Sequence, residues 1–278
     1  MSNTNPATAR STASRSSFYW AMRLLPHEKR EAMYAIYAFC RAVDDIADNI
    51  ASSDADLKTQ LELWRAAIAS LYRGRPSGRA AFLEAHVHQF ALREADFLSL
   101  IDGMEMDASG AMVAPHLQDL DRYCDCVASA VGRLSIKVFG MEDTSGFWLA
   151  HHLGRALQLT NILRDLDEDA GLGRLYLPRE LLESASVPHD SPARAIAHPA
   201  IDTVCRGVAE LAEMHYRETD TIFRSRPRGD LRPSRLMAAV YSAMLDRMKK
   251  CGWLPPRQRA QISKPALIGF ILRYGVAI

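Results

Sequence analysis

Residues 158–169 read QLTNILRDLDED, an apolar helical pattern that becomes acidic towards its end. Within it, Asn161, Asp165 and Asp169 recur every four residues, and Gln158 precedes the series by three. On an α-helix these positions lie on one face, about 6 Å apart per step. Like charges at this spacing destabilise a helix unless they are neutralised, and carboxylate and amide oxygens are ligands that Mg²⁺ accepts. The stretch therefore predicts either a magnesium site or a solvated acidic helix end.

A second acidic stripe lies upstream and favours the magnesium site. Tyr37, Arg41, Asp44 and Asp48 share one helical face, with Asp45 beside them. The residues just before this stripe are nearly all apolar or aromatic, which indicates a helix that is buried over most of its surface. Buried carboxylates are costly unless they are paired or metal-bound. We therefore expect one cavity with carboxylates on facing walls.

Composition narrows the class of protein. The chain has 278 residues, is 48% hydrophobic and 24% charged, and carries a formal net charge of +1. These values are typical of a globular protein and give no electrostatic case for a nucleic-acid partner. The five cysteines are odd in number and dispersed, which suits reduced thiols in the cytoplasm. The sequence has no zinc-ligand spacing, no GxGxxG and no P-loop, and no apolar run approaches the ~20 residues of a membrane span.

Helical periodicity dominates the chain, and no alternating strand pattern rises above it. We expect a disordered leader over residues 1–15 and a single all-α domain, a helical bundle with a central cavity, over 16–278. A polar connection is expected at 103–115. The expected helices are 18–25, 26–49, 54–72, 79–102 with a bend at 93–94, 117–138, 143–169, a short one from 178, 190–223, 230–250 and 266–274.

Two facing carboxylate clusters would repel an anion, by about 4 kcal/mol at 4 Å and an effective dielectric constant of 20. A bridging Mg²⁺ reverses the sign, so the clusters can anchor a diphosphate. Arg41, Arg164 and Arg174 stand beside the acidic residues, and the planar guanidinium suits phosphate oxygens. The pattern predicts a Mg²⁺-diphosphate site.

Aromatic residues favour an elongated hydrocarbon next to that site. A carbocation remains when diphosphate leaves an allylic carbon, and aromatic faces stabilise cations while excluding water. We assign Trp20, Tyr34 and Phe39 to the core, and functional positions to Tyr37, Tyr123 and Tyr241.

Several motifs together resemble the squalene/phytoene synthase family. Residues 44–48 (DDIAD) and 161–169 (NILRDLDED) look like its two aspartate-rich motifs. Residues 122–132 (RYCDCVASAVG) and 173–178 (GRLYLP) resemble two further signatures, and 16–18 and 37–41 match its N-terminal part. The resemblance spans roughly residues 16–274.

The resemblance implies an isoprenoid-synthase α-bundle that couples two prenyl diphosphates head to head with Mg²⁺. By position, the implied metal ligands are Asp44, Asp48, Asn161, Asp165 and Asp169. The implied substrate-binding residues are Ser17, Phe18, Arg41, Gln158, Arg164, Arg174 and Tyr241. The implied catalytic residues are Tyr37, Arg41 and Tyr123, of which Tyr123 would steer ionisation or the cation.

Within the family, residues 158–182 are most similar to bacterial members of hopanoid biosynthesis, which join two farnesyl diphosphates into presqualene diphosphate. We expect the reaction to stop there, without NADPH. The alternatives are a phytoene synthase acting on two geranylgeranyl diphosphates and a full NADPH-dependent squalene synthase. A terpene cyclase, a chain-elongating prenyltransferase and a non-catalytic assembly or scaffold relative are further alternatives.

The last helix is strongly apolar, with Lys264 and Arg273 at its edges. We expect a terminal core helix. The alternative is a shallow membrane contact that would make a cytoplasmic protein peripheral at the membrane.

Overall fold

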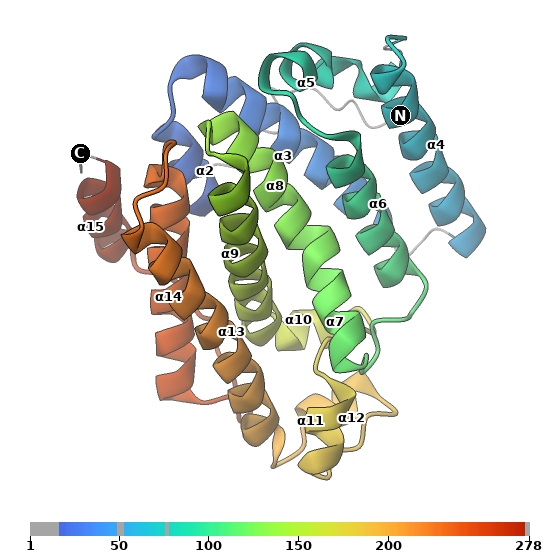
Figure 1. Cartoon of the computed structure of the whole chain (residues 1–278). Helices are drawn as coiled ribbons and strands as arrows, with labels where there is room; N and C mark the ends of the chain where they lie inside the picture. The colour runs from blue at the N-terminus through green and yellow to red at the C-terminus, as the bar shows by residue number, and fades with distance from the viewer. Residues whose placement is uncertain (1–16, 49–52, 76–77, 276–278) are drawn as a thin grey trace.

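The computed structural model describes residues 17–48, 53–75 and 78–275, so the expected leader over 1–15 lies outside the described residues. Within these ranges the chain is built from helices (Figure 1), and the only β-pairing is one isolated parallel bridge between Val113 and Leu175. The all-α class is confirmed. None of the described helices is long and apolar enough to cross a membrane.

The helices follow one another with short connections. The first half contains α2 (Ser17–Arg23), α3 (His27–Ala47), α4 (Asp54–Tyr72), a 3₁₀ segment (Gly78–Leu83), α5 (Glu84–Phe90), α6 (Glu94–Ala108), α7 (Leu117–Cys124), a π-turn (Asp125–Ser129) and α8 (Ala130–Phe139). The second half contains α9 (Asp143–Arg164), α10 (Leu166–Gly171), α11 (Arg179–Ser184), α12 (Pro192–Ile196), α13 (Ile201–Arg224), α14 (Arg232–Cys251) and α15 (Lys264–Gly275).

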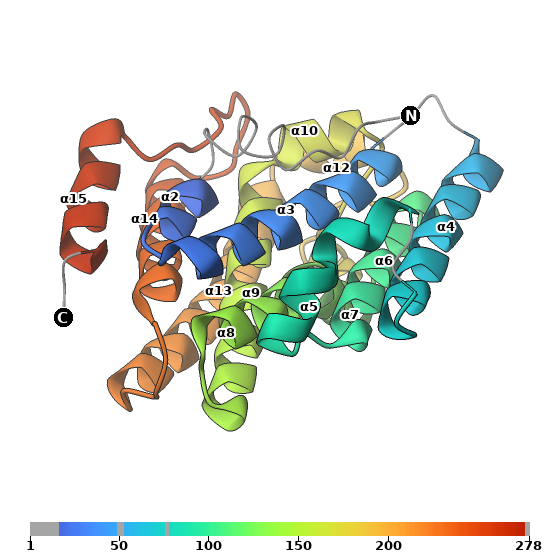
Figure 2. The ribbon, with the colours of Figure 1, turned by 90° about the horizontal axis from the view of Figure 1, so that it is seen from above.

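Helix α9 is the centre of the bundle. Its buried residues occur on all sides, from Leu149 to Leu163, which is typical of a helix surrounded by others. It packs against α8, α13 and α14. Seen from above, α4 and α15 lie at opposite ends of the molecule, with α9 between them (Figure 2).

Two apolar clusters hold in place the elements that contribute side chains to the candidate site. In the first, Phe39 of α3 makes edge-to-face contacts with Trp64 and Phe97, at centroid distances of 5.3 and 5.1 Å. The second cluster lies under the end of α9, where Leu163, Leu177 and Trp253 are buried. The first cluster therefore holds α3 in place, and the second holds the segment that follows α10.

The expected helix 117–138 is interrupted by the π-turn at Asp125–Ser129. Two glycines let neighbouring helices approach this turn closely. A Cβ on Gly103 of α6 would lie 2.5 Å from Val127, and one on Gly154 of α9 would lie 2.7 Å from the Ser129 backbone. Because no larger side chain fits there, the turn is enclosed between α6 and α9.

Three expected boundaries are wrong. The predicted connection over 103–115 is helical as far as Ala108, because Gly103 and Met104 are buried inside α6 rather than exposed in a loop. The predicted helix 143–169 breaks at Asp165, where the Leu163 carbonyl accepts a hydrogen bond from the Trp253 indole instead. The predicted helix 190–223 divides into α12 and α13 around residues 197–200, where a proline cannot continue the backbone ladder.

Two burial assignments are also wrong. Helix α15 has no buried residue; Leu267 and Phe270 pack against the bundle, while Ile268 and Leu272 are 56% and 62% exposed. The outer face has no helix beyond it within the described chain, so α15 is not a core helix. Trp20 is 37% exposed rather than buried, because it lies on the outer side of α2. Tyr34 and Phe39 are buried as expected.

Candidate active site

Two hollows meet in the middle of the bundle. The polar cavity, of about 360 Å³, is lined chiefly by arginines and carboxylates. The apolar cavity, of about 250 Å³, is lined mainly by aliphatic, methionine and aromatic side chains. Gln158 and Asn161 line both, so they mark the border at which the polarity of the walls changes.

The polar cavity brings together most of the residues that the two acidic stripes identified. Helix α3 and its last turn supply one wall, and the end of α9 with α10 supplies the other. The predicted residues that line it are Arg41, Asp44, Asp48, Tyr123, Gln158, Asn161, Arg164, Asp165, Asp169 and Arg174. Asp45 lines neither cavity: its side chain is 64% exposed and accepts a hydrogen bond from Arg41 at 2.5 Å.

Arginines join the two acidic walls. Arg41 donates to Asp44 at 2.5 Å within α3. Arg174, from the other wall, donates to Asp48 at 2.8 Å and to the Ala47 carbonyl at 2.9 Å. These contacts fix the distance between the end of α3 and the segment after α10.

Asp165 has two cationic partners. Arg164 donates to its two oxygens at 2.9 and 2.5 Å, and Arg259 donates at 2.7 Å. Burial alone would raise the pKa of this carboxyl, but the hydrogen bonds from the two arginines hold it below its usual value. Arg259 lies between α14 and α15, 94 residues along the chain, and nothing near it in the sequence indicated a place in the site.

The other carboxylates are less well neutralised. Burial raises the pKa of Asp44 to about 6 in spite of Arg41. Burial, followed by the charge of Asp165, raises the pKa of Asp169 to about 7. The cavity thus holds acidic groups whose charged forms would be stabilised by an added cation.

The donor set fits Mg²⁺. The Oδ1 atom of Asn161 is buried and has no hydrogen-bond partner in the structure, which suits a metal-ligating amide oxygen. In the described part of the chain, no three His, Cys, Asp or Glu side chains already surround one point as a metal site. The carboxylates contact arginines instead, so binding a metal requires some of those ion pairs to open.

A further carboxylate lines the polar cavity that the sequence did not single out. Tyr123 donates to Asp107 Oδ2 at 2.9 Å, and Tyr176 donates to Asp107 Oδ1 at 2.7 Å. The two phenol rings stack with centroids 5.1 Å apart and an interplanar angle of 21°. Burial raises the pKa of Asp107, against the opposing effect of the tyrosine hydrogen bonds and Arg174. Tyr176 stands inside the GRLYLP motif, which could have identified it, whereas Asp107 was placed in a connection.

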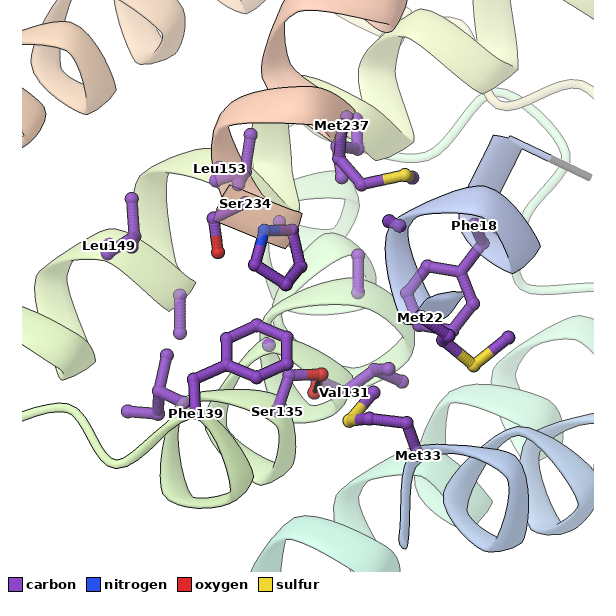
Figure 3. A pocket seen from close by; sticks show the side chains of 18 of the residues that line it. Phe18, Met22, Met33, Val131, Ser135, Phe139, Leu149, Leu153, Ser234 and Met237 are labelled. Carbon is purple, nitrogen blue, oxygen red and sulfur yellow. Dashed lines mark hydrogen bonds between the residues drawn. The ribbon is translucent and has the colours of Figure 1, made fainter. Parts of the chain in front are cut away.

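The apolar cavity follows α9 away from the border. From Asn161 to Leu149 it passes 12 residues of helix, or about 18 Å. Phe18, Met22 and Met33 approach from one side and Phe139 from the far end (Figure 3). Ser135 contributes little polarity, because its hydroxyl donates to the Val131 carbonyl. The shape and lining suit an extended hydrocarbon chain.

The remaining predicted aromatic residues line the apolar cavity rather than the polar one. Phe18 and Tyr37 lie together with ring centroids 5.9 Å apart, and Tyr241 of α14 lines the same cavity. The side chain of Ser17 lies outside the part of the molecule that the structure describes. The structure therefore divides the predicted residues between the two cavities.

Known proteins are similar to this chain in sequence and architecture. Residues 11–266 match the squalene/phytoene synthase family. A presqualene diphosphate synthase of Zymomonas mobilis is 55% identical over 266 residues, covering 96% of this chain and 91% of the relative. One from Rhodopseudomonas palustris is 44% identical over 271 residues, covering 98% and 97%. The crystal structure of a dehydrosqualene synthase with a ligand superposes with a TM-score of 0.82 at 26% identity, covering 97% of this chain and 94% of that one.

Proposed function

Because the chain belongs to the squalene/phytoene synthase family, we propose that it joins two farnesyl diphosphates head to head into presqualene diphosphate and releases one diphosphate. Residues 16–278 would act as one catalytic domain. The observation that supports this most strongly is the shared border of the two cavities at Gln158 and Asn161. A diphosphate in the polar cavity would place its hydrocarbon chain in the apolar one.

The polar cavity would hold the diphosphates and their metal. Asp44, Asp48, Asn161, Asp165 and Asp169 would bind Mg²⁺. When bound, the metal neutralises the diphosphate and makes it a better leaving group. The oxygens of the diphosphate would be bound by Arg41, Arg164 and Arg174, which already line this cavity.

The reaction follows from this arrangement. The C1–O bond of one allylic diphosphate breaks, and the C1 cation is attacked by the 2,3-double bond of the second molecule. Loss of a proton then closes the cyclopropane ring. Tyr37 and Tyr241 border the apolar cavity, and Tyr123 lines the polar one, so all three would lie near the developing positive charge. The apolar walls would exclude the water that could otherwise capture the cation.

A product assay tests the proposal. Purified protein is incubated with Mg²⁺ and labelled farnesyl diphosphate, with and without NADPH, and in parallel with geranylgeranyl diphosphate. We expect presqualene diphosphate from the C15 substrate, unchanged by NADPH. Squalene formed with NADPH would identify a full squalene synthase. Phytoene from the C20 substrate alone would replace the proposal, and no product from folded protein would favour a non-catalytic role.

The exposed face of α15 supports a second, smaller proposal: a cytoplasmic protein that touches a membrane surface. Ile268 and Leu272 lie one turn apart and project outward, and Arg273 lies next to them. We expect the double variant Ile268→Gln, Leu272→Gln to float less with liposomes than the wild type. Equal flotation by the two folded proteins would contradict this contact.

A further inference from the structure

Asp107 lies at a junction of three segments on the wall of the polar cavity. It projects from the last turn of α6 towards Tyr123 of α7 and Tyr176 of the segment after α10. Both phenols donate their hydrogen to it, at 2.9 and 2.7 Å. An ionised carboxylate only accepts hydrogen bonds, so the direction of both bonds is fixed.

The backbone holds this arrangement from two sides. Leu175 exchanges hydrogen bonds with residues 112 and 114, at 3.1 and 2.8 Å, and is buried in the second apolar cluster. In such an extended segment, residues two apart point to the same side. Arg174 and Tyr176 therefore both face the polar cavity while Leu175 and Leu177 face the core.

Asp107 determines the direction of both phenol O–H bonds. Each tyrosine has one O–H, and each is directed to Asp107. The phenol oxygens are 3.4 Å apart, so neither needs the other as a main partner. What remains available towards the cavity is oxygen lone pairs and no O–H donor.

A purely structural cross-link would not require a carboxylate. Tyr123 is 4% exposed and Tyr176 is 6% exposed, so Asp107 is bonded to two buried groups. Burying a carboxylate there costs free energy, which the two hydrogen bonds and the charge of Arg174 offset only in part, since the pKa of Asp107 is still raised. The proposed reaction creates a cation in the adjoining cavity, so the carboxylate of Asp107 can act on that cation electrostatically.

We propose that Asp107 is a positioning residue for the coupling reaction, holding the hydroxyl hydrogens of Tyr123 and Tyr176 away from the substrate so that both phenols present lone pairs to the allylic cation. This inference rests on the proposed function. An O–H turned into the cavity would instead oppose the cation and hydrogen-bond the leaving diphosphate. Asp107 thus controls the sign of the dipoles that the cation meets.

The replacement Asp107→Asn tests this with almost no change of shape. The amide keeps one acceptor oxygen but replaces the other with an NH2 donor, so one phenol loses its acceptor and its O–H is free to turn into the cavity. We expect kcat to fall on the order of 10²-fold with little change in KM, and a larger share of farnesol from cation capture by water. Calorimetric binding of Mg²⁺ with inorganic diphosphate is expected to stay unchanged, which separates this role from metal ligation.

A double-mutant cycle adds a readout that a structural role would not give. In a background that carries both Tyr123→Phe and Tyr176→Phe, neither hydroxyl remains for Asp107 to orient, so Asp107→Asn should lower kcat by less than about 3-fold. The matched control is Asp102→Asn on the same helix, whose exposed side chain pairs with Arg65 at 2.7 Å. This variant should retain the wild-type rate and product ratio.

The outcomes separate the two proposals. Active wild type together with an Asp107→Asn variant of unchanged kcat and product ratio overturns the inference alone. Equal losses in the wild-type background and in the background that carries both Tyr123→Phe and Tyr176→Phe also overturn it. Wild-type protein that forms no coupled product overturns the proposed function and the inference with it.

Discussion

The polar and apolar cavities are lined by the same helices at different heights. Helix α3 contributes Met33 to the apolar cavity and Asp44 to the polar one. Helix α9 contributes Leu149 at one end and Asp165 at the other. The change from hydrocarbon lining to charged lining therefore occurs along each helix and not between one helix and another.

This difference shows how a bundle can bind an amphiphile. Along both α3 and α9 the lining changes from apolar to charged at the border of the two cavities. A ligand with a charged head and an apolar chain therefore binds favourably in only one orientation. The border residues Gln158 and Asn161 then fix where the head ends and the chain begins. Methionines such as Met22, Met33 and Met237 line the apolar part, where their flexible side chains can adapt to a chain.

The largest expected effect comes from removing the best-neutralised acid of the polar cavity. We expect Asp165→Ala to lower turnover at least about 10³-fold, because the variant loses a proposed metal ligand. Steady-state product formation measures this. Asp190→Ala is the matched control, because Asp190 is a 65% exposed acid that pairs with Arg194 outside both cavities, and it should change the rate by less than about 3-fold. An unchanged rate in Asp165→Ala would mean that the polar cavity is not the reacting end.

The stability of that variant corrects a simple expectation. From the sequence, replacing Asp165 should relieve repulsion between neighbouring carboxylates. The structure shows that it is paired with Arg164 and Arg259, and its pKa lies below the usual value. We therefore expect Asp165→Ala to be somewhat less stable than the wild type in the absence of metal, although it stays folded.

A smaller effect is expected at the far end of the apolar cavity. Phe139→Ala should raise the kcat/KM ratio of geranylgeranyl to farnesyl diphosphate by about 10-fold, since the longer chain gains room. The variant should also lose about 3 kcal/mol of stability. Competition between the two substrates measures the ratio. Phe97→Ala removes an equally buried ring that lines neither cavity and should leave the ratio unchanged.

The smallest effect concerns the stability cost of the polar cavity. The pKa of Asp169 is raised to about 7 in the fold, above the usual 3.8, so the folded state binds the extra proton. Its stability contribution is present at low pH and is lost as pH rises through about 7. We expect Asp169→Asn to be more stable than the wild type by about 1 kcal/mol at pH 8 without metal, because solvent in the cavity weakens the full effect.

Chemical unfolding at pH 5 and pH 8 in the presence of a chelator measures this difference. The advantage of Asp169→Asn should widen with rising pH. If the difference in stability between Asp169→Asn and the wild type is the same at both pH values, the fold does not raise the pKa of Asp169.

The predictions that rest on the periodicity of a single unbroken helix are confirmed. Residues that repeat along one helix, such as Asp44 with Asp48, were placed together because helical geometry dictates it. Asp107 and Arg259 were missed because each reaches the cavity through packing between distant segments. Trp20 was misplaced because a short amphipathic helix does not reveal which side its neighbours will cover.

The break at Asp165 also depends on a contact with a distant segment, which local periodicity does not reveal. An uninterrupted pattern favoured one helix, yet a tryptophan 90 residues away takes the Leu163 carbonyl. Asn161 before the break and Asp169 after it still line one cavity, so the predicted site was less sensitive to this error than the predicted helix. The wrong helix boundary therefore did not change which residues were predicted to line the site.

The π-turn between α7 and α8 has one last consequence. Such a turn contains one residue more than an α-helical turn, and each residue of an α-helix rotates the chain by about 100°. The wider turn absorbs this extra residue, so Tyr123 before it keeps its direction towards Asp107 and Phe139 after it keeps its place at the apolar cavity; a regular α-helix of the same length would rotate one relative to the other by about 100°. The chemistry of the polar cavity thus depends on how many residues separate Tyr123 from α8, and not only on which residues they are.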